Sequence, residues 1–325
     1  MDTTKLNSTD LPTTLTEAVR YFADPDVSLQ FMVQLRWSDG PECPTCGSKD
    51  VRFIPTRRIW ECKCKHAKRQ FSVKVGTIFE DSALPIDKWL IAIWTEANCK
   101  NSISSYELAA TIGVTQKSAW FMQQRIRLAM QVGSFRAPLS GEVEVDETYI
   151  GGKARNMHAS SRRKAKGRGH FGKAVVLGLL ERHGQVRVKV VADNRRKTLY
   201  PLIREHVESG TTVFTDKLHT YDNLGLIHYF HHVIDHAECY VKGNVHTNGL
   251  ENFWALFKRC IKGTHVSVEP FHLFRYLDAE TFRFNNRKAT ALSRFLLAAA
   301  GIVGKRLTYK SLIGEAEKGL PPAMA

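Results

Sequence analysis

The segment EVEVDETYIGG, residues 142–152, decides how the second half of the chain is interpreted. Acids alternate with valines from Glu142 to Asp146, and a period of two is typical of a β-strand with one buried face. The acids then share one face and the valines the other, and the strand ends near Gly151 and Gly152. An acid at the end of a first strand, with further strands after it, is typical of a carboxylate metal site.

The residues after this segment predict a mixed α/β domain. The hydrophobic pattern after Pro138 predicts further strands at 175–180, 186–191 and 212–215, and helices at 198–207, 248–259 and 270–285. Strands, then a helix, a strand and more helices make a domain of about 150 residues with an α/β or α+β architecture.

Further candidates join Asp146 in the metal site. Asp216 directly follows the predicted strand 212–215, so it can reach the same edge of the sheet if the two strands are adjacent. Asn248, Glu251 and Lys258 share one polar face of the predicted helix 248–259. Two strand-end aspartates and a helical glutamate can hold a pair of Mg²⁺ or Mn²⁺ ions, which would activate a hydroxyl for attack on a phosphodiester. Lys258 would then contact a DNA phosphate. The alternative interpretation of each acid, taken alone, is a solvated surface residue.

Four of the seven cysteines predict a structural zinc site. Cys43 and Cys46 flank a two-residue gap followed by Gly47, which suits two thiolates on one ion. The second half-site contains Cys62, Cys64 and His66, of which the last two are alternatives for the fourth ligand. Cys62 and Cys64 would point to opposite sides of an extended strand, whereas His66 lies at a spacing that suits an imidazole. A ribbon of this size needs the ion to fold.

The segment after the ribbon has the pattern of a helix-turn-helix. Residues 104–112 predict a short helix that Gly113 ends, and Thr115 caps a second helix that continues to Met130. Its first turn would present Gln116, Lys117 and Ser118 to DNA. The alternative is an ordinary helical hairpin whose Trp120, Met122 and Ile126 build a core.

Composition excludes several classes of protein. The chain has 325 residues, 43% of them hydrophobic, which excludes a disordered chain, a collagen-like fibre and a disulfide-stapled mini-protein. No apolar run approaches the roughly 20 residues of a membrane span, and the first 15 residues do not resemble a signal peptide, so we expect a cytoplasmic protein. The net charge of +15 is concentrated in residues 43–75 and 151–175, which indicates a polyanionic partner such as nucleic acid.

Three motifs give the chain a family resemblance. FSVKVGTIFEDS (71–82), VDETYIGGK (145–153) and HTNGLENFW (246–254) strongly resemble the ISXO-like DDE transposases, which are encoded by bacterial insertion sequences and carry an N-terminal zinc ribbon. The resemblance covers residues 15–300. It implies an RNase H-like catalytic domain, preceded by the zinc ribbon and the helix-turn-helix-like segment, that cuts and joins DNA at terminal inverted repeats.

The resemblance also implies roles for individual residues. Asp146 and Asp216 match the first two acids of the family, while the third position is either Glu251 or Asn248. We favour Glu251, because a carboxylate binds Mg²⁺ better than an amide and because its seven-residue spacing to Lys258 suits a DDE site. The ribbon departs from the family's usual two-residue gap between the second pair of cysteines.

We therefore expect five segments and a DNA partner. The segments are an N-terminal helical segment (1–40), a zinc ribbon (41–80), a helix-turn-helix-like segment (84–135), an RNase H-like domain (139–290) and a C-terminal helical tail (291–325). The partner is double-stranded DNA, bound by a dimer or larger assembly that is associated with the nucleoid. The basic residues expected to contact it are Arg57, Arg58, Lys117, Lys153, Lys258 and Arg259.

Two other functions fit parts of the pattern. A non-catalytic DNA-binding regulator or a domesticated transposase would use only the ribbon and the helix-turn-helix, and such a protein would be free to lose the acids that this chain retains. A nuclease that resolves Holliday junctions would share the fold and metals, but it needs neither a sequence-reading ribbon nor a joining step.

Overall fold

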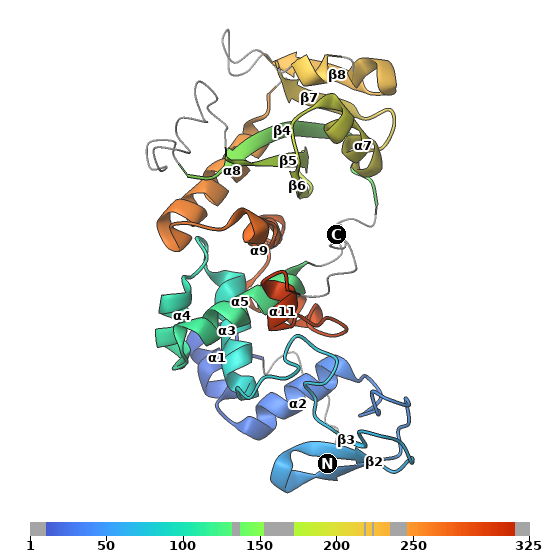
Figure 1. Cartoon of the computed structure of the whole chain (residues 1–325), viewed down its shortest axis with the longest axis vertical. Coiled ribbons are helices and arrows are strands. Elements are labelled where there is room, and N and C mark those ends of the chain that lie inside the picture. The colour runs from blue at the N-terminus through green and yellow to red at the C-terminus, as the bar shows by residue number, and fades with distance from the viewer. Residues whose placement is uncertain are drawn as a thin grey trace. The chain divides into compact units, whose positions relative to one another are not determined.

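A computed structural model describes residues 11–131, 137–152, 172–217, 219–222, 224–234 and 246–315. The chain forms two compact units (Figure 1). The first consists of Met1–Cys99, Ile103–Val132 and Ala289–Ala325, and the second of Lys100–Ser102 and Gly133–Lys288. The chain thus passes from the first unit through the second and returns to the first. The five segment boundaries expected from the sequence stay predictions.

Helices α1 (Leu15–Phe22) and α2 (Pro25–Arg36) open the first unit. Thr14 accepts a hydrogen bond from the amide of Glu17, whose own side chain binds back to Thr14, which makes a capping box. Asp24 caps α2, with a proline at its first position. The predicted break between the two helices is therefore set by local capping.

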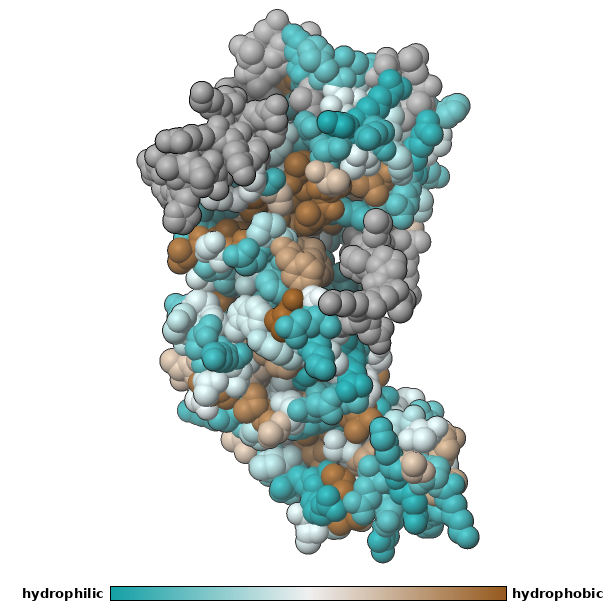
Figure 2. All heavy atoms as spheres, in the orientation of Figure 1, coloured by the Kyte–Doolittle hydropathy of each residue, from teal (hydrophilic) through white to brown (hydrophobic). Residues whose placement is uncertain are grey.

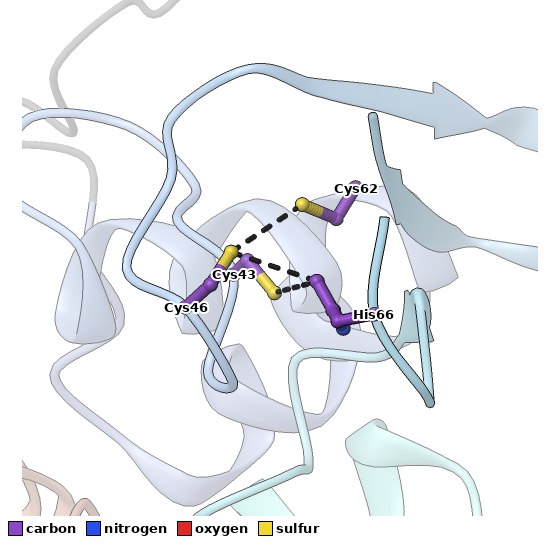
Figure 3. A group of neighbouring side chains, drawn as sticks. All are labelled: Cys43, Cys46, Cys62 and His66. Atoms are coloured by element: carbon purple, nitrogen blue, oxygen red, sulfur yellow. Dashed lines mark hydrogen bonds between the residues drawn. The ribbon is translucent and has the colours of Figure 1, made fainter. Parts of the chain in front are cut away.

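The zinc-ribbon segment forms a small antiparallel sheet of strands β1 (Val51–Ile54), β2 (Ile59–Cys62) and β3 (Gln70–Phe71). Trp60 and Phe71 stack on its buried side, with ring centroids 6.1 Å apart. Its visible surface is mostly hydrophilic (Figure 2), in keeping with the exposed lysines and arginines of these residues. The loop before β1, the end of β2 and the loop after β2 bring Cys43, Cys46, Cys62 and His66 together (Figure 3).

The core of the first unit forms around α3 (Ile86–Asn98), which contacts α1, α2, α4, α5 and α10. Helix α10 (Ala291–Ala300) returns from the far end of the chain. Its Phe295 stacks on Phe31 and packs against the tilted ring of Trp94. A short helix α11 (Tyr309–Leu312) follows it. The predicted C-terminal tail therefore contributes core side chains to the same unit as the N-terminal helices.

Helices α4 (Ser105–Ile112) and α5 (Gln116–Met130) form the predicted hairpin. Gly113 ends α4 with a φ of 63°, a left-handed conformation that favours glycine, and Thr115 caps α5. Lys117 is exposed in the first turn of α5. The later polar residues of α5 are buried and point into the unit, so they have no access to DNA; these are Gln123, Gln124, Arg125 and Arg127.

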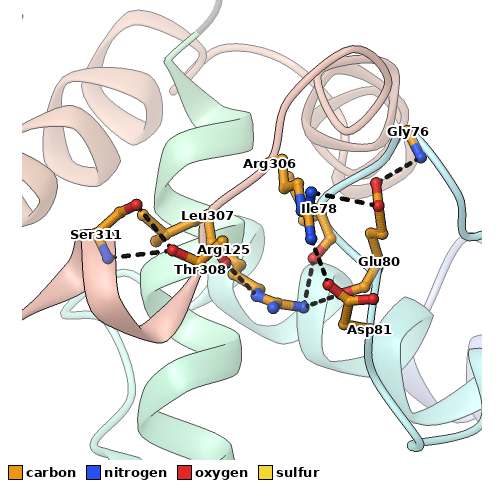
Figure 4. Close-up of polar contacts among 9 residues, drawn as sticks. All are labelled: Gly76, Ile78, Glu80, Asp81, Arg125, Arg306, Leu307, Thr308 and Ser311. Carbon is orange, nitrogen blue, oxygen red and sulfur yellow. Dashed lines mark hydrogen bonds and ion pairs between the residues drawn. The ribbon is translucent and has the colours of Figure 1, made fainter. Parts of the chain in front are cut away.

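Buried Arg125 joins three separate segments of the first unit (Figure 4). Its guanidinium donates to the carbonyl oxygens of Ile78 (3.0 Å), Glu80 (2.8 Å) and Leu307 (3.0 Å). Nearby Arg306 makes an exposed ion pair with Asp81, at 2.6 Å. The buried guanidinium therefore connects the returning C-terminal segment to residues 78–80. It can do so because a guanidinium has several N–H donors in one plane.

The second unit contains a five-stranded mixed sheet in the order β6-β5-β4-β7-β8. Its strands are β4 (Glu142–Ile150), β5 (Ala174–Glu181), β6 (Val186–Val191), β7 (Thr212–Asp216) and β8 (Phe230–Ile234). The first three pair antiparallel, whereas β7 pairs parallel to β4 and β8 parallel to β7. This mixed α/β architecture is consistent with the expected RNase H-like fold.

Helices cover both faces of this sheet. On one face, α7 (Arg196–His206) packs Leu199 and Ile203 against Val143 and Val145 of β4. On the other, α8 (Asn248–Cys260) and α9 (Leu273–Asn285) form a second apolar cluster with β5 and β6. The alternation in residues 142–146 is confirmed: the valines face α7, and the acid Glu144 contacts the start of α8. Within the described residues, no helix has the length and apolar character needed to cross a membrane.

Replacing Arg125 with methionine should lower the free energy of unfolding of the first unit by about 3 kcal/mol, because carbonyl oxygens would stay buried without donors. Urea unfolding followed by tryptophan fluorescence measures this, since five of the six tryptophans belong to that unit. The control, Arg306→Met, removes an exposed ion pair and should cost less than about 1 kcal/mol. Equal losses in the two variants would contradict the role given to Arg125.

Candidate functional site

The ribbon brings four metal-binding side chains together. The ligand atoms of Cys43, Cys46, Cys62 and His66 all lie within 4.8 Å of one another. His66 Nε2 is 3.4 Å from Cys43 Sγ and 3.5 Å from Cys46 Sγ, and the sulfurs of Cys46 and Cys62 are 3.6 Å apart (Figure 3). His66 Nδ1 lies 2.6 Å from the carbonyl oxygen of Ala67, a contact that turns Nε2 toward the sulfurs.

Local backbone geometry produces this grouping. The amide of Gly47 donates to the carbonyl of Cys43 in a tight turn, and Gly47 has a φ of 70°. Burial by itself would raise the pKa of Cys43, but backbone hydrogen bonds from Cys46 and Thr45, together with side-chain hydrogen bonds involving Cys46 and Cys62, lower it to about 7. Cys64 is exposed and is not a member of the four-residue group, although hydrogen bonds involving Ser48 and Cys62 lower its pKa. The geometry therefore groups His66, and not Cys64, with the three other cysteines.

A second group, the carboxylate group of Asp146, Glu147 and Asp216, lies where the pairing of β4 with β7 ends. This parallel pairing ends at Val145 and Thr215, and Asp146 and Asp216 are the next residues on each strand. Ligand oxygens of Asp146, Glu147 and Asp216 lie within 4.8 Å of one another, and all three residues are half-buried. The two predicted aspartates are thus neighbours. Only Asp216 ends its strand, however, because β4 continues past Asp146 to Ile150.

Three carboxyl groups this close repel one another. Burial, followed by the charges of Glu147 and Asp216, raises the pKa of Asp146 to about 7. Burial raises the pKa of Glu147 to about 7 as well, with Asp216 adding to the shift. A divalent cation would offset this repulsion, and hard oxygen ligands are those that Mg²⁺ and Mn²⁺ prefer. The residues present therefore fit such an ion.

Two aromatic side chains donate to this group. The indole N–H of Trp254 donates to Asp146 Oδ2 at 3.0 Å, and the hydroxyl of Tyr221 donates to Glu147 Oε2 at 2.7 Å. Lys258 is half-buried near the group: burial lowers the pKa of Lys258, and the negative charge of Asp146 opposes that shift. The group thus has a cationic neighbour on α8.

Glu147, Tyr221 and Trp254 were not among the predicted site residues. Strict alternation along β4 assigns Glu147 to the face opposite Asp146, and its contact with Tyr221 is on that face. Its carboxylate reaches the group because β7 no longer pairs with β4 at this level. The feature of the sequence that could have indicated Glu147 is its place directly after Asp146 in the VDETYIGGK motif.

The two candidates for the third acid lie on the first turn of α8. Asn248 and Glu251 are both exposed, and neither is a member of the carboxylate group. Glu251 lies three residues before Trp254 and seven before Lys258, so all three are on one stripe of the helix. Since Trp254 contacts Asp146 and Lys258 lies near it, this stripe faces the carboxylate group.

The predicted DNA-contacting residues lie at exposed or half-exposed positions where the structure describes them. Arg57 and Arg58 are exposed on the ribbon, where Arg57 donates to Gln70 and Arg58 pairs with Asp26 at 2.7 Å. Arg259 is exposed on α8 beside half-buried Lys258. Lys153 lies outside the described residues.

Buried Glu144 anchors the start of α8. It accepts hydrogen bonds from the amide of Leu250 at 2.9 Å and from Arg182 Nε at 3.2 Å, and His246 Nδ1 lies 3.4 Å away. Gly249 is required beside it, because a Cβ there would lie 2.8 Å from a Glu144 oxygen and 2.3 Å from Leu180. The helix that carries Glu251, Trp254 and Lys258 is therefore fixed to β4 two residues before Asp146.

Glu144→Gln should destabilise the second unit by about 3 kcal/mol, because it leaves the buried guanidinium of Arg182 without its buried carboxylate. Hydrogen–deuterium exchange of α8 peptides measures the loss. Glu142→Gln removes the exposed partner of the same arginine and should cost less than about 1 kcal/mol. If α8 exchanges equally fast in both variants, Glu144 is not the anchor.

Both sites lie in regions that are similar to transposase domains. Residues 25–67 match the transposase zinc-ribbon domain family, and residues 138–285 match the ISXO2-like transposase domain family. The chain is 30% identical over 291 residues to an uncharacterized protein in transposable element ISH50 of Halobacterium salinarum, a match that covers 83% of this chain and 96% of that protein. It is 35% identical over 103 residues to an uncharacterized transposase-like protein of Haemophilus influenzae, covering 31% of this chain and 82% of that protein.

The matched ranges contain the cysteine–histidine group and the carboxylate group respectively. The ribbon, the mixed sheet and the two neighbouring aspartates thus follow the order expected from the sequence motifs. The chain belongs to the ISXO2-like family of zinc-ribbon DDE transposases, the transposases of insertion sequences.

Proposed function

We propose that this chain binds the terminal inverted repeats of its insertion sequence, hydrolyses phosphodiester bonds at the ends and joins the resulting 3′-OH groups to target DNA. The observation that carries this proposal is the carboxylate group at the point where β4 and β7 separate. Half-buried acids that converge from adjacent strands are costly to a fold that does not use them, because burial and mutual repulsion both oppose their charge.

Asp146 and Asp216 would hold the catalytic Mg²⁺ or Mn²⁺, and Glu251 would complete the ligand set. Glu251 supports this role by sharing the helix stripe of Trp254 and Lys258. Asn248 is the weaker alternative, because an amide oxygen binds Mg²⁺ less well than a carboxylate. When bound, such ions activate the attacking hydroxyl and stabilise the leaving oxygen of a phosphodiester.

Basic side chains would position the DNA strands. Half-buried Lys258, near Asp146, would contact the phosphate next to the reacting bond, and Arg259 a phosphate farther along. Arg57 and Arg58 on the ribbon, Lys117 on α5 and Lys153 would neutralise further phosphates and make binding sensitive to salt. Joining two ends calls for a dimer or larger assembly on DNA, which we propose to operate in the cytoplasm on the nucleoid.

The ribbon would be held by a structural zinc ion on Cys43, Cys46, Cys62 and His66. Four protein ligands leave no open position, so this ion would have no catalytic role. It supports folding of a segment whose buried side chains are few.

Zinc content of purified variants tests the ribbon ligands. Cys62→Ser and His66→Ala should lose the ion and unfold the ribbon, whereas Cys64→Ser and Cys99→Ser should keep wild-type zinc, since neither belongs to the group. Zinc loss in Cys64→Ser with retention in His66→Ala would instead make Cys64 the fourth ligand.

Cleavage and joining of labelled DNA that carries the element's own ends tests the catalytic proposal. Asp146→Asn and Asp216→Asn should each lower the rates of cleavage and joining more than about 100-fold, while folding and DNA binding stay intact. Loss of a metal ligand should reduce activity more than loss of a residue that only orients a ligand, which typically costs about 10- to 100-fold. EDTA should have the same effect on the wild type. Asp222→Asn is the control, since Asp222 is exposed and outside the group.

Comparison of Glu251→Gln, Asn248→Ala and Glu147→Gln in the same assay identifies the third ligand. The proposal expects a loss comparable to that of the aspartate variants for Glu251→Gln and a smaller loss for Asn248→Ala.

Tight, metal-independent binding of the repeats by the wild type without any cleavage would overturn the enzymatic proposal in favour of a DNA-binding regulator.

A further inference from the structure

The carboxylate of Asp146 is held by two donors of different origin. Its Oδ1 accepts the amide N–H of Glu147 at 2.8 Å, and its Oδ2 accepts the indole N–H of Trp254 at 3.0 Å. The first donor is fixed by the backbone of β4 itself. The second comes from α8, 108 residues later in the chain. Both oxygens of one carboxylate are thereby oriented, and each keeps lone-pair capacity for a further ligand.

The position of the indole depends on a missing side chain in the neighbouring strand. Gly178 lies directly opposite Asp146 in the antiparallel pairing of β4 and β5, so both residues present the same face of the sheet. A Cβ at Gly178 would lie 2.5 Å from Trp254 Cζ2, far inside van der Waals contact. The indole therefore occupies the space that a side chain at 178 would take, and only glycine lets it reach Asp146.

The rest of Trp254 is fixed by packing. Its side chain is buried among the apolar residues of α8, α9 and β5, and its ring meets that of Phe253 edge to face at 5.1 Å. A residue placed only for its apolar surface would not need to point its one polar atom at a half-buried acid. The indole N–H is a donor that carries no charge, so it orients Asp146 without neutralising it. A lysine or arginine in its place would compete with a cation for the carboxylate.

We propose that Trp254 is a positioning residue for the metal ligand Asp146, and that Gly178 exists to admit its indole. This inference rests on the proposed function, because it takes Asp146 as a ligand of the divalent ion. It assigns to the tryptophan of the HTNGLENFW segment a role in the site as well as in the core.

Binding of Mn²⁺ to the full chain without DNA tests this, with free Mn²⁺ measured by electron paramagnetic resonance. Trp254→Phe keeps the ring but removes the donor, and we expect Mn²⁺ to bind roughly tenfold more weakly. The matched control is Trp89→Phe, which removes the N–H of another buried tryptophan, bonded to Ser82 in the first unit, and should leave the affinity unchanged. Gly178→Ala should weaken binding as Trp254→Phe does, whereas Gly263→Ala, whose Cβ would meet nothing within 4 Å, should not.

A spectroscopic readout tests whether the ion binds beside Trp254. Trp254 is the one tryptophan in the sequence of the second unit, and a paramagnetic ion on Asp146 should quench its fluorescence at short range. The Mn²⁺-dependent quenching should vanish in Trp254→Phe and in Asp146→Asn, and persist in Trp89→Phe. This readout needs only the wild type and Asp146→Asn if Trp254→Phe fails to fold.

The outcomes distinguish the two proposals. If Asp146→Asn and Asp216→Asn lose Mn²⁺ binding while Trp254→Phe and Gly178→Ala bind as the wild type does, the positioning role is wrong and the metal site stands. If Asp146→Asn binds Mn²⁺ as well as the wild type, the proposed metal site itself fails. Reduced stability of Trp254→Phe with unchanged Mn²⁺ affinity would make Trp254 a core residue only.

Discussion

The second unit depends on how one buried carboxylate is satisfied. Glu144 has almost no access to water, and an ionised group in such a place needs nearby donors, because its desolvation costs several kcal/mol. It obtains them from Arg182, beyond the end of β5, and from the amide of Leu250 at the start of α8. This requirement fixes the helix to the sheet at one defined level. The next residue of β4 on the same face is Asp146, which meets the next turn of the helix through Trp254.

The carboxylate group is the opposite case, because it brings like charges close together. Three acids converge where two strands separate, and burial, with their mutual repulsion added, raises the pKa of Asp146 and Glu147. Neutral groups donate hydrogen bonds to Asp146 and Glu147: a backbone amide, Trp254 and Tyr221. Neutral donors orient an acid but leave its charge available, and this combination suits a site that binds a cation. Such local cost is typical of functional sites.

The sequence predicts the structure correctly where periodicity and spacing carry the information. The alternation around Glu144 and the place of Asp216 after an apolar run predict strands that the structure confirms, and these two features locate most of the candidate site. It missed Glu147, because a period of two assigns neighbours to opposite faces and cannot show where strand pairing ends. It could not decide whether α5 reads DNA, because burial of Arg125 depends on contacts with Ile78 and with Leu307, 182 residues later in the chain.

Helix α8 contributes side chains both to the core and to the candidate site. Its 3.6-residue period assigns Leu250, Phe253 and Phe257 to the core and leaves Glu251 and Lys258 on the adjoining stripe. Trp254 lies on the border of the two sets, so its ring packs with the core while its N–H reaches Asp146. The aromatic residues of the motif are therefore not independent of the acids. Because Phe253 packs against both Trp254 and Phe284, a change in its volume would be transmitted to the indole and from there to the carboxylate that it orients.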